Sequence, residues 1–176
     1  TFKKTLVGYE DGLIVVINEA DGSMLNVVDI VKKQFTSNSK RINHFLEHNG
    51  IVFISCDFGI VQFNLSTLQF GDTYFIGSSG EEIRVYQTTI YNNEIYAATQ
   101  LFGIRKGNLS NPNLNDYRQW QVFDNGFWKG IVTFNNQLVF YNSNNILYKF
   151  NGTSFDEILN LGQERMHFKA TSNYLI

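Results

Sequence analysis

The chain has 176 residues, a formal net charge of −2, and 43% hydrophobic against 17% charged residues. This composition excludes an intrinsically disordered chain, and the charge gives no general attraction to nucleic acid or to an anionic membrane. The single cysteine, Cys56, excludes an intrachain disulfide. No apolar run reaches the length of about 18 residues that a transmembrane helix needs.

The first predicted elements form one incomplete repeat unit over residues 1–35. Residues 6–9 and 13–17 are expected to pair as a hairpin that turns at Gly12. Residues 25–31 match a short amphipathic helix, but their β-branched content favours an outer strand. The polar and basic segment 32–41 is predicted to be an exposed loop between units.

Three complete units are predicted at about residues 41–80, 81–123 and 126–162, and residues 165–176 are predicted to begin another. Each complete unit has four short β-rich runs separated by Gly and Asn turns. The predicted strands are residues 42–48, 51–56, 60–65 and 72–77, then 83–90, 94–99, 104–109 and 117–123, then 127–134, 138–142, 146–151 and 155–161. The third unit carries an insertion at residues 110–116, where Pro112 is expected in a loop or at a sheet edge.

These units repeat with a period in the forties. The turn residues Gly12, Gly59, Gly103 and Asn145 are 47, 44 and 42 residues apart. A period of this length built from strands is typical of a β-propeller blade. The sequence therefore predicts an all-β fold, a β-propeller of four-stranded antiparallel blades in a single domain over residues 1–176.

About four blades are few for a closed ring. We expect an arc of a larger propeller, of the seven-bladed type. In the alternative, residues 166–170 supply the missing inner strand of the first unit and close a four-bladed ring. A small or polar residue recurs in the second strand of each unit, at Gly8, Ser55, Thr99 and Asn142, which indicates crowding where the blades converge.

Several segments in the middle of the chain resemble a known family. They are FGIV at 58–61, DTYFIG at 72–77, IYAAT at 95–99, Gly103-Ile104, PNL at 112–114 and Trp120. Over about residues 8–120 this pattern resembles the N-terminal β-propeller of the PorZ family, which belongs to the type IX secretion apparatus of Bacteroidetes. The match becomes a generic blade pattern beyond residue 120.

The resemblance implies a non-enzymatic binding or scaffolding role and a place at the cell surface, at the outer membrane or in the periplasm. It implies protein partners in the secretion and sortase complex, and anionic lipopolysaccharide as a further ligand that is passed to the sortase. It carries over no individual ligand residue, no catalytic residue and no cofactor.

The residues themselves suggest few chemical sites. His44 and His48 lie on one predicted strand about 13 Å apart by strand rise, too far to share a metal ion, and His167 is remote in sequence. Residues 18–22 lack the alternating acidic ligands of a calcium loop. The neighbouring carboxylate of Asp57 is expected to raise rather than lower the pKa of Cys56, which is interpreted as a structural cysteine in a blade strand. The sequons that begin at Asn64, Asn108 and Asn151 are interpreted as turn asparagines.

Two groups of residues remain candidates for partner binding. The basic group Lys32, Lys33, Lys40 and Arg41 is interpreted as a solvated loop, with contact to an anionic partner as the functional alternative. The aromatic group Tyr117, Trp120 and Trp128 is interpreted as blade core, with a sugar-stacking or protein-contact platform as its alternative.

Two other function classes stay open. One is a ligand-sensing propeller of a periplasmic two-component-type sensor, which a downstream transmembrane helix and kinase would support. The other is an enzyme that uses a propeller funnel, which requires carboxylates, histidines or metal ligands converging on one rim. The sequence shows no such cluster.

Overall fold

The structure is a computed structural model that describes residues 2–162, 168–171 and 173–175, and these residues form four antiparallel sheets. Sheet one contains β1 (Lys4–Gly8), β2 (Ile14–Asn18) and β3 (Met24–Val27), followed by α1 (Asp29–Lys32). Sheet two contains β4 (Ile42–His48), β5 (Ile51–Cys56), β6 (Gly59–Asn64) and β7 (Gln69–Tyr74).

Sheet three contains β8 (Val85–Tyr91), β9 (Glu94–Thr99), β10 (Ile104–Asn108) and β11 (Gln121–Asp124), with the 3₁₀ helix η1 (Tyr117–Gln119) before β11. Sheet four contains β12 (Trp128–Phe134), β13 (Gln137–Asn142), β14 (Ile146–Phe150) and β15 (Phe155–Asn160). In both sheets each strand pairs with the next along the chain, as in a propeller blade.

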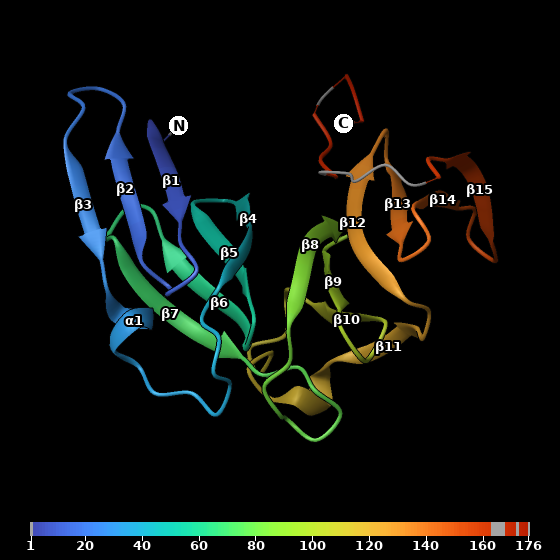
Figure 1. Ribbon diagram of the computed structural model, residues 1–176, viewed down its shortest axis with the longest axis horizontal. Coiled ribbons are helices and arrows are strands. Elements are labelled where there is room, and N and C mark those ends of the chain that lie inside the picture. Colours follow the sequence, from blue (N-terminus) through green and yellow to red (C-terminus); the bar gives the residue numbers. More distant parts are fainter. Residues whose placement is uncertain (1, 163–167, 172, 176) are drawn as a thin grey trace.

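The four sheets are arranged as an arc around a common centre (Figure 1). The first strands of the complete sheets, β4, β8 and β12, lie next to one another at this centre, and we call them the inner strands. The turn at Gly12 lies between β1 and β2, and the matching turns of the other sheets, at Gly59, Gly103 and Asn145, lie between their second and third strands. β1 therefore corresponds to the second strand of each other sheet. Within the described residues, sheet one therefore has no inner strand, and the arc is open beside β1.

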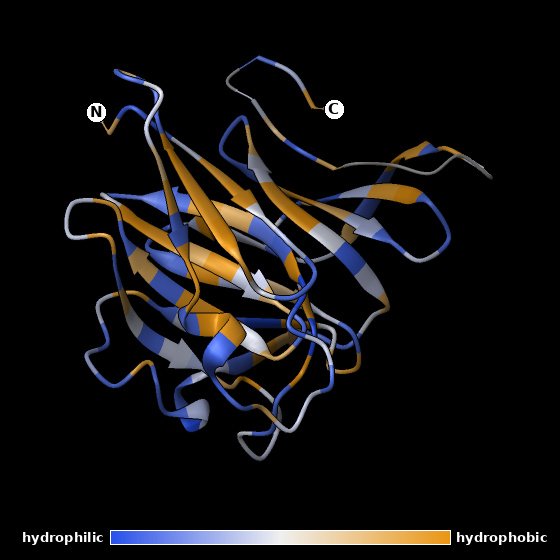
Figure 2. Cartoon of the chain, turned by 60° about the vertical axis from the view of Figure 1, so that its left-hand side comes forward, coloured by the Kyte–Doolittle hydropathy of each residue, from blue (hydrophilic) through white to orange (hydrophobic). Residues whose placement is uncertain are grey.

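Each sheet is buried on the faces that meet its neighbours. Along β5, Val52 and Ile54 contribute to the core shared with sheet one, whereas Phe53 contributes to the core shared with sheet three. A third core joins sheets three and four around Phe140 and Trp128. Hydrophobic and hydrophilic residues both occur along the strands, and the strands carry much of the hydrophobic colour (Figure 2). Burial of both faces, at roughly 25 cal/mol per Å² of apolar surface, holds the arc together.

The connections show why asparagine and glycine recur in this sequence. Asn135 and Asn136 in the β12–β13 turn have φ of 47° and 57°, which gives the left-handed turn that matches the twist of paired strands. The side-chain oxygen of Asn64 accepts hydrogen bonds from the backbone N–H groups of Ser66 and Thr67. Asn108 and Asn151 accept equivalent bonds, so the turn interpretation of these asparagines is confirmed.

Crowding at the centre is confirmed at Gly8. A Cβ added there would lie 2.7 Å from Cγ2 of Ile42, so only glycine fits between the first two sheets. Pro112 lies in the loop between β10 and η1, as predicted.

Three predicted strands are wrong in part, and one of them is the strand expected at residues 72–77, since β7 spans Gln69–Tyr74. Residues 25–31 were expected to form one strand, but β3 ends at Val27 and residues 29–32 form a single helical turn. This turn begins with Asp29, a favourable residue at a helix start, and buries Ile30 in the first core. Residues 117–123 do not form one strand either, because Asp116 caps η1 by accepting a hydrogen bond from the backbone N–H of Arg118, and β11 begins at Gln121.

The alternative prediction was that residues 166–170 supply the inner strand of the first unit and close a four-bladed ring. Met166 and His167 lie outside the described residues. Ala170 forms a bridge with Leu175, in the same antiparallel sense as Thr133 with Leu138 in the β12–β13 pair. This bridge has the spacing of the Thr133–Leu138 pair, and a following blade stays a prediction.

Candidate functional site

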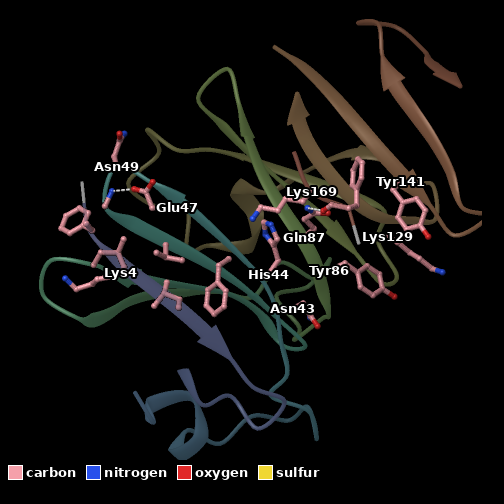
Figure 3. A pocket seen from close by; sticks show the side chains of 17 residues that line it. Lys4, Asn43, His44, Glu47, Asn49, Tyr86, Gln87, Lys129, Tyr141 and Lys169 are labelled. Carbon is pink, nitrogen blue, oxygen red and sulfur yellow. Dashed lines mark hydrogen bonds between the residues drawn. The ribbon is translucent and has the colours of Figure 1, made fainter. Parts of the chain in front are cut away.

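A cavity of about 1040 Å³ lies at the open centre of the arc (Figure 3). Its walls come from β1, β4, β8 and β12, from Tyr141 of β13 and from residues 168–169. We call it the axial cavity. Its volume is at the upper end of the range for pockets that bind small molecules.

The inner strands carry a β-bulge at the same repeat position. In β4 the register shifts between Ile42 and His44, in β8 between Val85 and Gln87, and in β12 between Trp128 and Gly130. The extra residues are Asn43, Tyr86 and Lys129, which stand 43 residues apart in the sequence. All three line the axial cavity. A bulge changes the direction of one side chain while the neighbouring residues keep their strand pairing. Each inner strand therefore contributes its bulge residue to the cavity.

The charge of the axial cavity is positive. Lys4, Lys129 and Lys169 line it together with one carboxylate, Glu47, so three ammonium groups against one carboxylate give a local charge of +2. Glu47 Oε1 already accepts a hydrogen bond of 2.7 Å from the backbone N–H of Gly50. Within the described part of the chain, none of the three lysines forms a salt bridge. The amines are therefore available to an anionic ligand.

His44 contributes a neutral imidazole to this wall. Burial, and to a smaller extent the positive charge of Lys169, lowers the pKa of His44 to about 4. Nδ1 of His44 is buried without a hydrogen-bond partner among the described residues. A neutral ring with an unpartnered nitrogen can donate to or accept from a ligand at neutral pH.

Two amide side chains fix the inner strands to one another. Asn43 Nδ2 donates to Asp57 Oδ1 and to the carbonyl oxygen of Val85, each at 2.9 Å. Gln87 Nε2 donates to the carbonyl oxygen of Phe168 at 2.8 Å, while its Oε1 accepts from the N–H of Ile131 at 3.3 Å. These bonds join successive sheets, so the cavity wall is held in place before any ligand arrives.

Asp57 supports this wall from behind. Its side chain is 2% exposed and forms a bidentate ion pair with Arg84, with distances of 2.7 and 2.8 Å to Nε and Nη2. Ser39 Oγ also donates to Asp57 at 2.6 Å. The hydrogen bonds from Arg84, Ser39 and Asn43 outweigh the cost of burial and lower the pKa of Asp57.

The basic residues predicted from the sequence lie away from the axial cavity, around α1 and the loop that follows it. Arg41 pairs with Glu10 at 3.4 Å, and Lys40 donates its ammonium group to the carbonyl oxygen of Val31. Lys33 lies 5.6 Å from the ring centroid of Phe35, and Lys32 ends α1. Two of the four cations are thus engaged within the chain, and contact of this group with an anionic partner stays a prediction.

The aromatic group is divided between two cores. Trp120 is 4% exposed in the core between sheets two and three, and Trp128 is 7% exposed in the core between sheets three and four. Tyr117 lies on η1 and is half-buried. The structure therefore does not bring the three rings together, and partner contact stays a prediction that rests on Tyr117.

The other sequence motifs have structural positions. Cys56 is fully buried, and burial followed by the charge of Asp57 raises its pKa, as expected. His44 and His48 line different cavities. The described residues contain no group of three His, Cys, Asp or Glu side chains that could hold a metal ion, and no helix among them is long and apolar enough to cross a membrane.

Sequence reasoning missed the axial cavity, although one signal was present. Asn43, Tyr86 and Lys129 recur at a constant spacing of 43 residues. These three residues line the cavity because each is the extra residue of a β-bulge. The position of a bulge depends on strand register, which cannot be read from a single sequence.

Comparisons with known proteins agree with this fold. The family model described as TSS9, PorZ, N-terminal beta-propeller domain matches residues 1–121. PorZ of Porphyromonas gingivalis, described as an essential bacterial surface component of the type IX secretion system, is similar in structure, with a TM-score of 0.73 at 17% identity. The similarity covers 89% of this chain and 20% of that one, so the chain spans about a fifth of the length of that PorZ.

Other solved structures share the fold at lower similarity. BamB from Moraxella catarrhalis matches with a TM-score of 0.60 at 10% identity, over 92% of this chain and 48% of its own. The extracellular domain of a protein from B. thetaiotaomicron, described as a one-component system, matches with a TM-score of 0.55 at 14% identity, over 94% of this chain and 22% of its own.

No curated protein matches the sequence closely enough to count as a relative. The family model covers well over half of the chain, and the segments that suggested the resemblance lie within the matched residues. The chain belongs to the PorZ N-terminal β-propeller family.

Proposed function

We propose that this chain is a non-enzymatic binding domain of a type IX secretion component at the bacterial surface, and that its axial cavity recognises an anionic glycan of the lipopolysaccharide class. Membership of the PorZ family supports the secretion role. The observation that carries the ligand class is the local charge of +2 in the axial cavity of a chain whose net charge is −2.

The geometry favours an anionic sugar over a simple ion. Three amines are distributed over β1, β12 and residue 169, around a cavity of about 1040 Å³ that also contains Tyr86, Tyr141 and Phe168. Distributed amines suit a ligand with several separated acidic groups, and aromatic rings suit the apolar faces of sugar rings. Transfer of such a ligand to a sortase partner is the role that the family suggests.

The test is binding of purified anionic lipopolysaccharide to the full chain. The triple variant K4Q/K129Q/K169Q should bind at least about tenfold more weakly than the original chain, because each lysine near an anionic surface contributes roughly 1 kcal/mol. The matched control is K32Q/K33Q, which removes charge from the basic group near α1.

Two results would contradict the proposal. If the triple variant binds as well as the original chain, the axial cavity is not the site. If only K32Q/K33Q loses binding, the basic group near α1 is the site instead. Retention of sortase-complex components by the immobilised chain, above that of a chain with scrambled loops, tests the protein partner separately.

The sensor alternative has weaker support. The similarity to the B. thetaiotaomicron extracellular domain has a TM-score of 0.55, against 0.73 for PorZ. A kinase downstream of a transmembrane helix in the parent gene would favour it over the secretion role.

A further inference from the structure

A second cavity, of about 410 Å³, lies between sheets two and three, and Asn49 at the β4–β5 turn lines both this cavity and the axial cavity. One wall is made of the strand residues Gln62, Asp72 and Tyr74 of sheet two, and the other of the β10–η1 loop with Leu109 and Pro112. The turn residues Asn49 and Asn93 also line it. We call it the rim cleft.

The insertion in the third unit builds this cleft. The corresponding connections in sheets two and four, β6–β7 and β14–β15, are short turns of four residues, at 65–68 and 151–154. In sheet three the connection runs from Leu109 to Trp120 and is internally fixed: Trp120 Nε1 donates to the carbonyl oxygen of Leu114 at 2.9 Å. Leu114 itself is 5% exposed. An ordered insertion that walls a cleft is a feature that the fold alone does not require.

The amide nitrogens around the rim cleft are already used. Gln62 Nε2 donates to the hydroxyl oxygen of Tyr74 at 2.5 Å, and Asn93 Nδ2 donates to Ser110 Oγ at 2.8 Å. Asn49 Nδ2 contacts His48 Nε2 at 3.0 Å, and Asn111 Nδ2 donates to Gln119 Oε1 at 2.7 Å. Each amide therefore has its nitrogen directed at a group of this chain.

The oxygens are mostly free. Within the described residues, no hydrogen bond reaches the side-chain oxygens of Gln62, Asn49 or Asn93, or the carboxylate of Asp72. The Tyr74 hydroxyl is held in a buried position, where burial and the nearby charge of Asp72 raise its pKa to about 12, so it stays neutral. The rim cleft thus offers three carbonyl oxygens and one carboxylate to a ligand.

A ligand for such a site needs many donors and a positive charge. The arginine guanidinium has five N–H donors and no acceptor, and it pairs with carboxylates through two parallel bonds. The apolar wall of Leu109, Pro112 and Leu114 suits the methylene stem of the same side chain. A neutral sugar fits less well, since each of its hydroxyls requires acceptors and donors alike.

We infer that the rim cleft binds an arginine side chain of a partner protein, with Asp72 as the charged anchor and the insertion loop as the wall. This inference does not depend on the axial cavity or on its ligand. It gives the chain a protein-contact site whose charge is opposite to that of the proposed glycan site.

The experiment titrates the full chain with the peptide acetyl-Gly-Arg-Gly-amide and follows amide chemical shifts. The same titration is made with peptides that carry Glu or Gln in place of Arg, and with glucose as a neutral sugar. The Arg peptide should shift resonances of β7 and of the β10–η1 loop, whereas the Glu peptide and glucose should not.

The variant D72N should weaken binding of the Arg peptide by about threefold, because Asp72 is exposed and its attraction is partly screened. The control E157Q makes the same charge change at an exposed position on β15 and should bind as the original chain does. The inference is overturned if D72N binds normally, if E157Q weakens binding equally, or if the Gln peptide or glucose binds as well as the Arg peptide.

Discussion

The axial cavity and the rim cleft are built from the same repeated strands, yet they offer opposite chemistry. The axial cavity presents three amines on or beside the inner strands, while the rim cleft presents a carboxylate and carbonyl oxygens from turns and outer strands. The axial cavity is lined by one β-bulge residue from each of three sheets, whereas the rim cleft is walled by an insertion in one sheet. In this fold, features that recur in every complete sheet therefore line the central cavity, and a feature found in one sheet lines the cleft at the rim.

The largest effect on the difference between the two cavities is expected when Asp57, which holds the wall of the axial cavity from behind, is removed. The variant D57A should lower the free energy of unfolding by about 3 kcal/mol, because it leaves Arg84 and Asn43 without their buried partner. Anionic-ligand binding should weaken more than Arg-peptide binding. Urea unfolding measures the first effect. D156A on β15 should cost about 1 kcal/mol or less, and an equal loss in both variants would contradict the role given to Asp57.

The next largest effect is expected in the wall of the rim cleft. The variant L114A should cost about 2 kcal/mol, because it opens a cavity beside Trp120, and it should weaken Arg-peptide binding while leaving anionic-ligand binding intact. Leu159 is 49% exposed, so L159A is a matched control with little expected effect. Loss of both binding activities in L114A would show that the two sites are not separate.

A pH titration sharpens the description of the axial wall. The pKa of His44 is about 4 in the fold, below its ordinary value, so the unfolded chain binds more protons between about pH 4 and 6.5. The stability that depends on neutral His44 is complete above about pH 6.5 and falls as the pH drops toward 4. At pH 5.5 the loss should be about 1 kcal/mol. The variant H44Q should lack this slope in urea unfolding measured between pH 7 and 4.5, and an unchanged slope would assign it to other groups.

The smallest effect concerns a single amine. The variant K129Q should weaken anionic-ligand binding by about threefold, because Lys129 is exposed and its attraction is partly screened. The difference between K129Q and the original chain should shrink as the salt concentration rises. Arg-peptide binding should stay constant in K129Q, and a parallel loss there would contradict the separation of the two charges.

Much of the fold could be predicted from the sequence because its signals are local. The turns at Gly59 and Asn145 predicted the hairpins, and the nearly continuous apolar run at residues 51–56 is typical of a strand that is buried on both faces. The short helix at Asp29 was missed, because a single turn is decided by a capping charge and by the burial of Ile30 rather than by propensity.

The candidate sites were harder to predict, because they depend on which strands meet. The sequence drew attention to Lys32 and Lys33, which are adjacent in the chain, whereas Lys4, Lys129 and Lys169 are far apart in sequence and line one cavity only because of the arc. The insertion around Pro112 was visible, but not that it faces Asp72 of the preceding sheet.

The bulges in β4, β8 and β12 have one further consequence. A bulged residue has no direct cross-strand partner, so its identity is free of the pairing that constrains its neighbours. Asn43 is held by its bonds to Asp57 and Val85, so related chains can exchange the residues at positions 86 and 129, but not the residue at 43, without loss of a contact between sheets. Point substitutions at positions 86 and 129 can therefore change the ligand preference of the axial cavity while the bonds of Asn43 keep its wall in place.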